Sequence, residues 1–330
     1  MQLQQREAKT ALIIGGNGTF GSAVGQELLA QGWKVKVLLR NNLRRPKWMA
    51  STATIAAVQI FTGDCSVLAD VERAAQEVDL LVYAANPSYS HWQQQAFRML
   101  EPSVIMAEKL QLQILFPGNI YAYDPEIPPV IDEFSELTPP TGKGVIRQAM
   151  ERRLQRAGAN GATVTLIRCG DFIAKDSASS WMQHLLSAKK SHWNLANPSV
   201  NSGGKDHYHS YVWVEDLAKN ALALVDYDSQ YNGNSFNQWC DPGLFVSHQD
   251  WLQAFAKSDI PVKSSNFPWW GLKLMGLFSP EIREVWKMRY LWRQSLALEG
   301  SKIRRALGER YKCQSLGQVV RALTGTEIRN

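Results

Sequence analysis

Three ionisable side chains stand four residues apart in the stretch "TGKGVIRQAME", which covers residues 141–151. On a helix, Lys143, Arg147 and Glu151 share one face. The simplest interpretation is a solvated helix surface with an ion pair between Arg147 and Glu151, which would contribute little to stability. A chemical interpretation is also open, because the fixed charge of Arg147 favours the neutral form of a nearby Lys143. A lysine with a lowered pKa can act as an acid or base near neutral pH.

The elements that would position these side chains follow an alternating pattern. Apolar segments with Gly, Asn, Asp or Arg at or near their ends predict strands at 11–16, 34–40, 55–64, 79–86, 113–119 and 163–172. Helical spacing lies between them at 20–32, 66–78, 92–110 and 143–157. This alternation predicts an α/β fold, a Rossmann-type doubly wound parallel sheet with helices on both faces. We expect residues 1–172 to form this domain and 173–330 to form mainly a smaller C-terminal substrate-binding lobe, with some segments returning to the core domain.

A glycine-rich turn joins the first predicted strand to the first helix. The turn reads "GGNGTFG" over residues 15–21. Gly15 allows a tight turn, Gly18 allows a pyrophosphate to approach the backbone, and Gly21 allows the helix to pack close to the sheet. The amide groups at the helix start then face the phosphates. This strand–turn–helix context predicts a dinucleotide site made by Gly15, Asn17, Gly18, Thr19, Phe20 and Gly21.

An arginine ends the second predicted strand, where enzymes that use NAD usually carry an acidic residue. Arg40 at this position suits the 2′-phosphate of NADP. Asn41, Arg44 and Arg45 follow and would reinforce the positive charge. We therefore expect NADP rather than NAD, although Arg40 could also extend past the sheet edge into solvent without a ligand.

Five segments of the sequence together resemble the extended or atypical short-chain dehydrogenase/reductase superfamily, which includes the NAD-dependent epimerase/dehydratase and NmrA-like families. They are "GGNGTFG", "GDCS" (63–66), "AAN" (84–86), "IRCGDF" (167–172) and "HYHSYVWVEDLAKNALALV" (207–225), and the resemblance covers most of the chain. It implies adenine contacts from Asp64 and Cys65. It also implies that Ala84, Ala85, Asn86, Pro117, Gly118, Cys169 and Gly170 line the cofactor.

The resemblance also gives the opening stretch a meaning. Members of this superfamily use a Tyr-x-x-x-Lys pair on the helix after the fifth strand, with a serine at the end of that strand. Here Lys143 takes the tyrosine position, Arg147 the lysine position, and Asn119 in "FPGNIYAYD" stands at or near the serine position. Arg147 can still bind the ribose hydroxyls of the cofactor. We predict Lys143 as the replacement proton donor and Asn119 as the polarising group, with Tyr121 or Tyr123 as displaced donors.

Two functions follow from these residues. The first is an NADP-dependent oxidoreductase or epimerase-like enzyme that transfers hydride to or from a small or medium carbonyl or hydroxyl substrate, with a non-standard proton donor. The second is a non-catalytic NADP-binding regulator or sensor that resembles the NmrA-like branch, which the loss of the tyrosine would explain. Lys143→Ala distinguishes them, because under the first function it should abolish turnover but spare cofactor binding.

The composition and charge pattern favour a small-molecule substrate over a nucleic acid as the binding partner. The chain has 330 residues and a net charge of +6, but its basic residues are mostly scattered, which argues against nucleic-acid binding. The four cysteines show no CxxC spacing, and the polar start "MQLQQREAKT" does not look like a secretory signal, so a cytoplasmic protein is expected. His207 and His209 have weak spacing for zinc, and no metal is predicted. A homodimer is expected by family analogy alone.

No membrane partner is expected either. The most membrane-like segment, "FPWWGLKLMGLF" (267–278), is short and contains Lys273. We therefore expect it to pack on the core or line a pocket.

Overall fold

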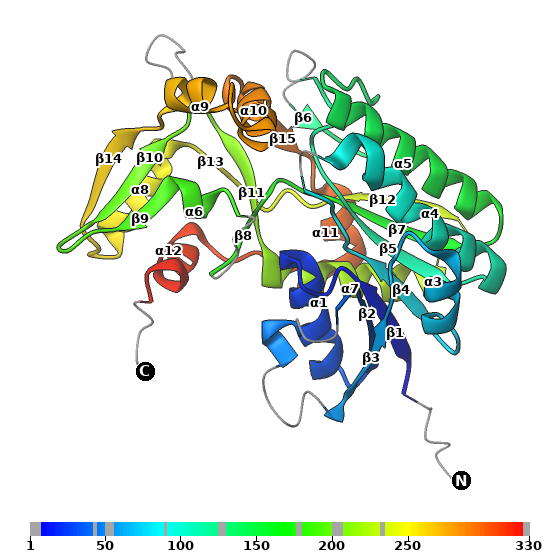
Figure 1. Ribbon diagram of the computed structural model, residues 1–330. Coiled ribbons are helices and arrows are strands. Elements are labelled where there is room, and N and C mark those ends of the chain that lie inside the picture. The colour runs from blue at the N-terminus through cyan, green and yellow to red at the C-terminus, as the bar shows by residue number, and fades with distance from the viewer. Residues whose placement is uncertain are drawn as a thin grey trace.

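The computed structural model describes residues 8–41, 45–49, 56–88, 91–124, 130–175, 180–199, 207–231 and 235–325 (Figure 1). Within these ranges no helix combines the length and the apolar composition needed to cross a bilayer. The strands are β1 (Thr10–Ile14), β2 (Lys34–Leu39), β3 (Val58–Thr62), β4 (Leu80–Tyr83), β5 (Gln113–Gly118), β6 (Val130–Ile131), β7 (Thr163–Arg168), β8 (Asp171–Ile173), β9 (Leu186–Ala188), β10 (Trp193–Asn197), β11 (His209–Trp213), β12 (Phe236–Cys240), β13 (Leu244–Val246), β14 (Val262–Asn266) and β15 (Ala297–Leu298). The helices are α1 (Thr19–Ala30), α3 (Leu68–Ala74), α4 (Trp92–Leu110), α5 (Gly142–Ala159), α6 (Met182–Leu185), α7 (Val214–Tyr231), α8 (His248–Lys257), α9 (Trp269–Met275), α10 (Pro280–Lys287), α11 (Ser301–Leu307) and α12 (Leu316–Thr324), with short 3-10 turns η1 (Lys47–Met49), η3 (Met288–Trp292) and η4 (Gly308–Arg310).

A parallel sheet of seven strands forms the centre of the molecule, in the order β12-β7-β5-β4-β1-β2-β3. Every neighbouring pair in it is parallel. β2 and β3 follow on one side of β1, and β4 and β5 follow on the other side, so the strand order changes direction at β1. A crevice at such a point, beyond the carboxyl ends of the strands, is where open α/β sheets bind ligands. The predicted Rossmann-type fold is therefore confirmed.

The two faces of the sheet carry separate hydrophobic cores, as the alternation of side chains along a strand requires. Leu12 and Ile14 of β1 belong to the core under α3, α4 and α5. Their neighbours Ala11 and Ile13 belong to the core under α1, α7 and α11. Because both faces of each central strand are buried, these strands are apolar throughout rather than alternating.

The second half of the chain contributes to both the central sheet and a smaller lobe. β12 forms the seventh strand of the sheet beside β7, and α7 packs against α1. The lobe contains two three-stranded sheets, β14-β10-β9 and β13-β11-β8. In Figure 1 it lies to one side of the central sheet, with α8, α9 and α12 around it.

The segment 267–278 differs in part from its expected placement. Phe267 and Trp269 pack against the core as predicted. However, α9 has no buried residue, and Trp270, Leu277 and Phe278 are exposed. Most of this apolar segment therefore faces outward.

Candidate active site

A cleft of about 580 Å³ opens at the carboxyl ends of the central strands. This volume is typical of sites that hold small molecules and cofactors. One side of the cleft comes from the glycine-rich turn and the ends of β2, β4 and β5, and the other from the lobe. Most of the predicted site residues line it: Gly15, Asn17, Gly18, Thr19, Phe20, Arg40, Cys65, Ala84, Ala85, Asn86, Pro117, Gly118, Asn119, Tyr121, Arg147 and Gly170.

The glycine-rich turn has the geometry that its sequence predicted. Gly15 has a φ of +92°, which favours glycine, and a β-carbon there would overlap the backbone of Ala84 and Ala85 at the end of β4. Gly21 does not line the cleft, but a β-carbon there would overlap the carbonyl group of Gly15. The two glycines therefore keep α1 close to the strands, with its N-terminus, which begins after Gly18, at the edge of the cleft.

A tryptophan that the sequence analysis did not single out supports this turn. The Nε1 of Trp48 donates a hydrogen bond to the carbonyl oxygen of Gly16 at 2.9 Å. A β-carbon at Gly25 in α1 would lie within 3 Å of the Trp48 ring, so the ring packs directly on the helix. No local motif announces this contact, because the residues are brought together only by the packing of η1 on α1.

The residues expected to contact the adenosine differ in whether they line the cleft. Arg40 is exposed and lines the cleft after β2, whereas Arg44 lies outside the described residues. Cys65 lines the cleft, and burial, together with the nearby Asp64 charge, raises the pKa of its thiol to about 11. Asp64 is not among the lining residues. Its Oδ1 accepts a hydrogen bond from the Ser66 backbone at 2.8 Å. Its carboxylate stabilises the turn before α3.

Cys169 lies beneath the cleft rather than on its surface. It is 1% exposed, and its Sγ is 3.7 Å from the carbonyl oxygen of Gly118. Burial raises the pKa of this thiol well above its ordinary value, so it remains a neutral thiol. Gly170, the next residue, does line the cleft.

Arg147 is a buried cation that faces the cleft. Its side chain is 9% exposed, and its guanidinium carbon lies 5.2 Å from the centre of the Trp92 ring and 5.1 Å from that of Phe116. Its Nη1 is 3.5 Å from the carbonyl oxygen of Pro117, and its buried Nε has no hydrogen-bond partner. Among the described residues no carboxylate lies within ion-pair distance of it. Burial lowers the pKa of this guanidinium, which indicates that its charge is poorly compensated by the protein.

The expected ion pair between Arg147 and Glu151 does not form. Glu151 instead accepts two hydrogen bonds from Arg168 of β7, at 2.8 and 3.0 Å. Arg168 also donates to the side chain of Gln238 on β12 at 3.0 Å. Helical spacing places Arg147 and Glu151 on one face of α5, but the bidentate geometry of Arg168 gives the carboxylate a better partner.

Lys143 begins the same face of α5 but does not line the cleft. Its Nζ lies 3.7 Å from the Oε2 of Glu284 on α10, and its side chain is only 5% exposed. Burial lowers the pKa of this amine from its ordinary value of 10.5 to about 8, while Glu284 opposes the shift. The pKa is thus suited to acid–base chemistry because of burial, whereas the sequence had suggested the charge of Arg147 as the cause.

Asn119 and Tyr121 both reach the cleft from the turn that follows β5. The side-chain oxygen of Asn119 accepts a hydrogen bond from the Tyr121 backbone at 3.0 Å. The amide is therefore oriented so that its NH₂ group is the donor left for another partner. Tyr123 is different, since it is 1% exposed, does not line the cleft, and lies against Arg168 in the core.

A buried acid–histidine pair separates the cleft from a smaller pocket in the lobe. Asp171 lines the cleft, and its Oδ2 is 2.8 Å from the Nε2 of His209. The His209 ring stacks on Trp292, with 3.8 Å between the ring centres. Sequence analysis missed Asp171, although it belongs to the quoted "IRCGDF" segment.

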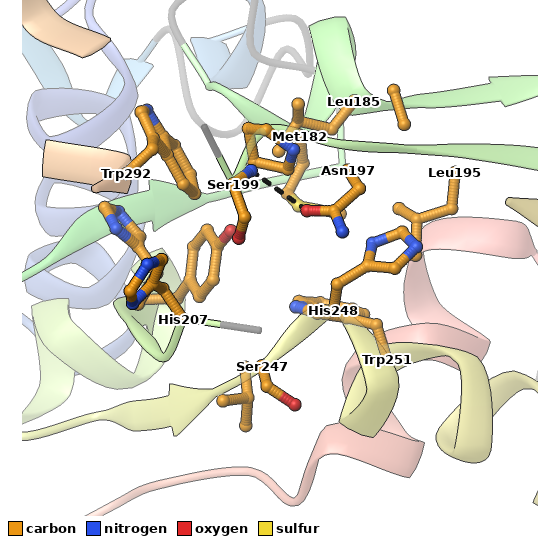
Figure 2. A pocket seen from close by; sticks show the side chains of 15 residues that line it. Met182, Leu185, Leu195, Asn197, Ser199, His207, Ser247, His248, Trp251 and Trp292 are labelled. Carbon is orange, nitrogen blue, oxygen red and sulfur yellow. Dashed lines mark hydrogen bonds between the residues drawn. The ribbon is translucent and has the colours of Figure 1, made fainter. Parts of the chain in front are cut away.

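The smaller pocket has a volume of about 20 Å³, which is room for roughly one water molecule. Figure 2 shows His207, His248, Trp251 and Trp292 around it. In the part of the chain that the structure describes, no group of three or more His, Cys, Asp or Glu side chains could hold a metal ion. With this volume the pocket is too small for a substrate. Within the described residues, His207 and His209 belong to no such metal-binding group.

Comparisons with known proteins agree with this fold and cleft. The sequence of residues 11–237 matches the NAD dependent epimerase/dehydratase family, so the chain belongs to this family. No curated protein matches the chain in sequence. Membership in the family supports an NAD(P)-dependent oxidoreductase or epimerase that binds a nicotinamide cofactor.

Several solved structures have a similar fold. The UDP-Glc/GlcNAc 4-epimerase from Campylobacter jejuni gives a TM-score of 0.69 at 16% identity, over 96% of this chain and 98% of that chain. The UDP-glucose 4-epimerase from Bifidobacterium longum, in complex with NAD+ and UDP, gives 0.69 at 16% identity over 96% and 97%. The L-threonine dehydrogenase from Clostridium difficile gives 0.72 at 13% identity over 97% and 99%. At such low identity these likenesses establish the fold alone.

The residues of the cleft fit a dinucleotide. Gly15, Gly18 and Thr19 line the cleft, so α1, which begins at Thr19, presents the positive end of its helix dipole there. Arg147 adds a buried positive charge with an unpartnered Nε further along the cleft. Both features suit a ligand that carries phosphates and ribose hydroxyls.

Proposed function

We propose that the protein is an NADP-dependent oxidoreductase or epimerase-like enzyme that acts on a carbonyl or hydroxyl group of a small or medium substrate. The observation that carries this proposal is Arg147, a buried cation that lines the cofactor cleft and lacks a carboxylate partner in the described chain. A charge in such a position is costly unless a ligand compensates it. When bound, NADP supplies the hydride donor or acceptor. Arg147 would bind its ribose hydroxyls and hold the nicotinamide end in place.

The residues around Arg147 support assignments for the substrate. Asn119 would donate a hydrogen bond to the substrate oxygen through its amide NH₂ group. Tyr121 would exchange the proton with that oxygen, since it lines the cleft beside Arg147, whose charge would stabilise a phenolate. Trp92, Phe172 and Trp181 also line the cleft, which suits an apolar or ring-bearing portion of the substrate. Lys143 is the second candidate for the proton donor, because its pKa of about 8 is suitable but its amine is turned to Glu284.

Two measurements test this proposal. Calorimetric titration should give tighter binding of NADPH than of NADH, and tighter binding of NADH would contradict the cofactor assignment. A panel of aldehydes and ketones should then include a compound that oxidises NADPH in the presence of the protein. Tyr121→Phe should lower kcat on that compound by about 100-fold or more while cofactor affinity is retained. If Lys143→Met lowers kcat to that extent and Tyr121→Phe does not, Lys143 is the donor.

The second candidate function is a non-catalytic NADP-binding regulator. The position of Lys143 at Glu284 favours it, because the residue that replaces the expected tyrosine does not reach the cleft. Under this alternative NADPH binds, no carbonyl compound is turned over, and cofactor binding changes the lobe instead. Limited proteolysis with and without NADP measures that change.

A further inference from the structure

Five large apolar side chains project from α9 and the turn that follows it. Trp270, Leu274, Met275, Leu277 and Phe278 are 74%, 55%, 54%, 73% and 90% exposed, and we call them the apolar tip. Single exposed apolar residues are ordinary on protein surfaces. Five within nine consecutive residues are not, and such a cluster marks an interaction surface.

The base of α9 is fixed to the lobe, so the tip is held outward. The Nε1 of Trp269 donates a hydrogen bond to the carbonyl oxygen of Pro198 at 2.8 Å. The Trp269 ring lies 4.8 Å from the ring of Phe267 and 6.2 Å from that of Trp181. α9 also packs beside α10, and neither helix has a buried residue (Figure 1). The lobe thus presents the tip at its surface without covering it.

The charges near the tip are mainly positive. Lys273 and Arg289 lie over the ring of Trp286, at 6.0 and 3.3 Å from its centre, and Arg283 is exposed on α10. Of the two carboxylates of α10, Glu284 is paired with lysines, whereas Glu281 is exposed. Glu284 pairs with Lys143 at 3.7 Å and with Lys287 at 2.6 Å, and Glu281 lines the cleft.

We propose that the apolar tip docks on the surface of an anionic lipid bilayer. Its five side chains would enter the boundary between headgroups and acyl chains, with Lys273, Arg283 and Arg289 against the lipid phosphates. A second copy of the chain fits less well, because a two-fold contact at the tip would place these basic residues beside their own copies. The proposal concerns a segment that lies on a membrane, so it agrees with the lack of a spanning helix in the described chain. None of the five residues lines the cleft, so the proposal does not depend on the reaction.

Cosedimentation of the full chain with vesicles tests this docking. One set of vesicles contains phosphatidylcholine alone, and the other contains phosphatidylcholine with phosphatidylserine. We expect binding to the anionic vesicles that weakens with added salt. Leu277→Asp with Phe278→Asp should reduce it more than about tenfold. Lys273→Gln should reduce it about fivefold on anionic vesicles. Tyr231→Asp is the matched control, because Tyr231 is 63% exposed but lies at the end of α7, and it should bind as the wild type does.

Three outcomes would overturn the proposal. One is that the wild type does not sediment with anionic vesicles. Another is that the Leu277/Phe278 double variant sediments as well as the wild type does. The third is that the wild type forms a dimer in sedimentation velocity that the double variant loses, without vesicle binding, which would assign the tip to a second copy. NADPH affinity is measured on every variant to show that each is folded.

Discussion

Arg147 and Arg168 are two buried arginines on adjoining elements, and their surroundings are opposite. Arg168 is 1% exposed and forms two hydrogen bonds to Glu151, whereas Arg147 is 9% exposed and has no such carboxylate among the described residues. Burial opposes the charged form of both. At Arg168 the charge and hydrogen bonds of Glu151 more than offset burial, so its pKa lies above the ordinary value. At Arg147 the charge of Glu151 acts without a hydrogen bond and does not offset burial, so the pKa of Arg147 lies below the ordinary value.

This difference separates a charge that belongs to the fold from one that belongs to a ligand. Arg168 joins β7 to α5 through Glu151 and to β12 through Gln238, so its hydrogen bonds are satisfied within the protein. Arg147 lies over the rings of Trp92 and Phe116 and opens on the cleft, and the charge of Glu151 favours its charged form without an ion pair. A buried charge that the protein itself leaves unpaired is a candidate for function.

Arg168→Met should give the largest effect on stability. It leaves the Glu151 carboxylate buried at 3% exposure without its ionic partner. Removing one member of a buried pair typically costs about 3–5 kcal/mol. Urea unfolding of the protein without cofactor measures the loss, and Arg147→Met is the matched control. A loss of less than about 1 kcal/mol would contradict the structural role of the pair.

Arg147→Met should reverse this pattern. Because burial opposes this charge, Met in its place should not lower the free energy of unfolding of the protein without cofactor and should raise it by about 1 kcal/mol or more. The affinity for NADPH should fall by about 10- to 100-fold, since hydrogen bonds to charged groups contribute about 1.5–3 kcal/mol. Calorimetric titration measures the affinity. If Arg147→Met and Arg168→Met destabilise the protein equally and leave NADPH binding unchanged, the two arginines do not differ in the way proposed.

The sequence predicted the central sheet well because most of its strands are buried on both faces and therefore read as continuous apolar runs. The helix predicted at 92–110 matches α4 in both its ends. β12 was missed because "FNQWC" contains two adjacent polar residues, which an edge strand that is partly exposed and pairs only with β7 can accommodate. Residues 267–278 were predicted to pack on the core or line a pocket, since their apolar composition alone cannot show that the helix faces outward.

The parts of the candidate site that were predictable are those formed by neighbours in the sequence. The glycine turn and the ends of β4 and β5 carry their own local pattern. The partners of the charged residues of α5 were not predictable. Glu151 pairs with Arg168, 17 residues away, and Lys143 with Glu284, 141 residues away. Helical spacing shows which side chains share a face, but only tertiary packing decides which of them meet a partner.

Lys143 is a third buried cation. It has an acidic neighbour, Glu284, but burial still lowers the pKa of its amine. Its pKa is about 8 in the folded protein and 10.5 in its ordinary environment. The unfolded chain therefore holds more protons than the folded protein between these two pH values, and stability rises with pH across that window. Below pH 8 the buried charge opposes folding in full. Wild type should gain about 1–3 kcal/mol relative to Lys143→Met between pH 7 and pH 10 in urea unfolding. A constant difference across this range would contradict the lowered pKa.

Arg40 provides the smallest and most selective test, at the opposite end of the cleft from Arg147. It is exposed and lines the cleft at the end of β2, so its removal should leave stability unchanged and act on a ligand that reaches this end. Arg40→Ala should weaken NADPH binding about tenfold through the loss of a charge-assisted contact to the 2′-phosphate, and should leave NADH binding within about twofold. Arg45→Ala is the control, since Arg45 is exposed and is not among the residues that line the cleft. If Arg40→Ala weakens both cofactors equally, Arg40 attracts the shared pyrophosphate from a distance and does not select NADP. Arg147→Met, in contrast, should weaken both cofactors alike, because the ribose beside the nicotinamide is the same in NADPH and NADH.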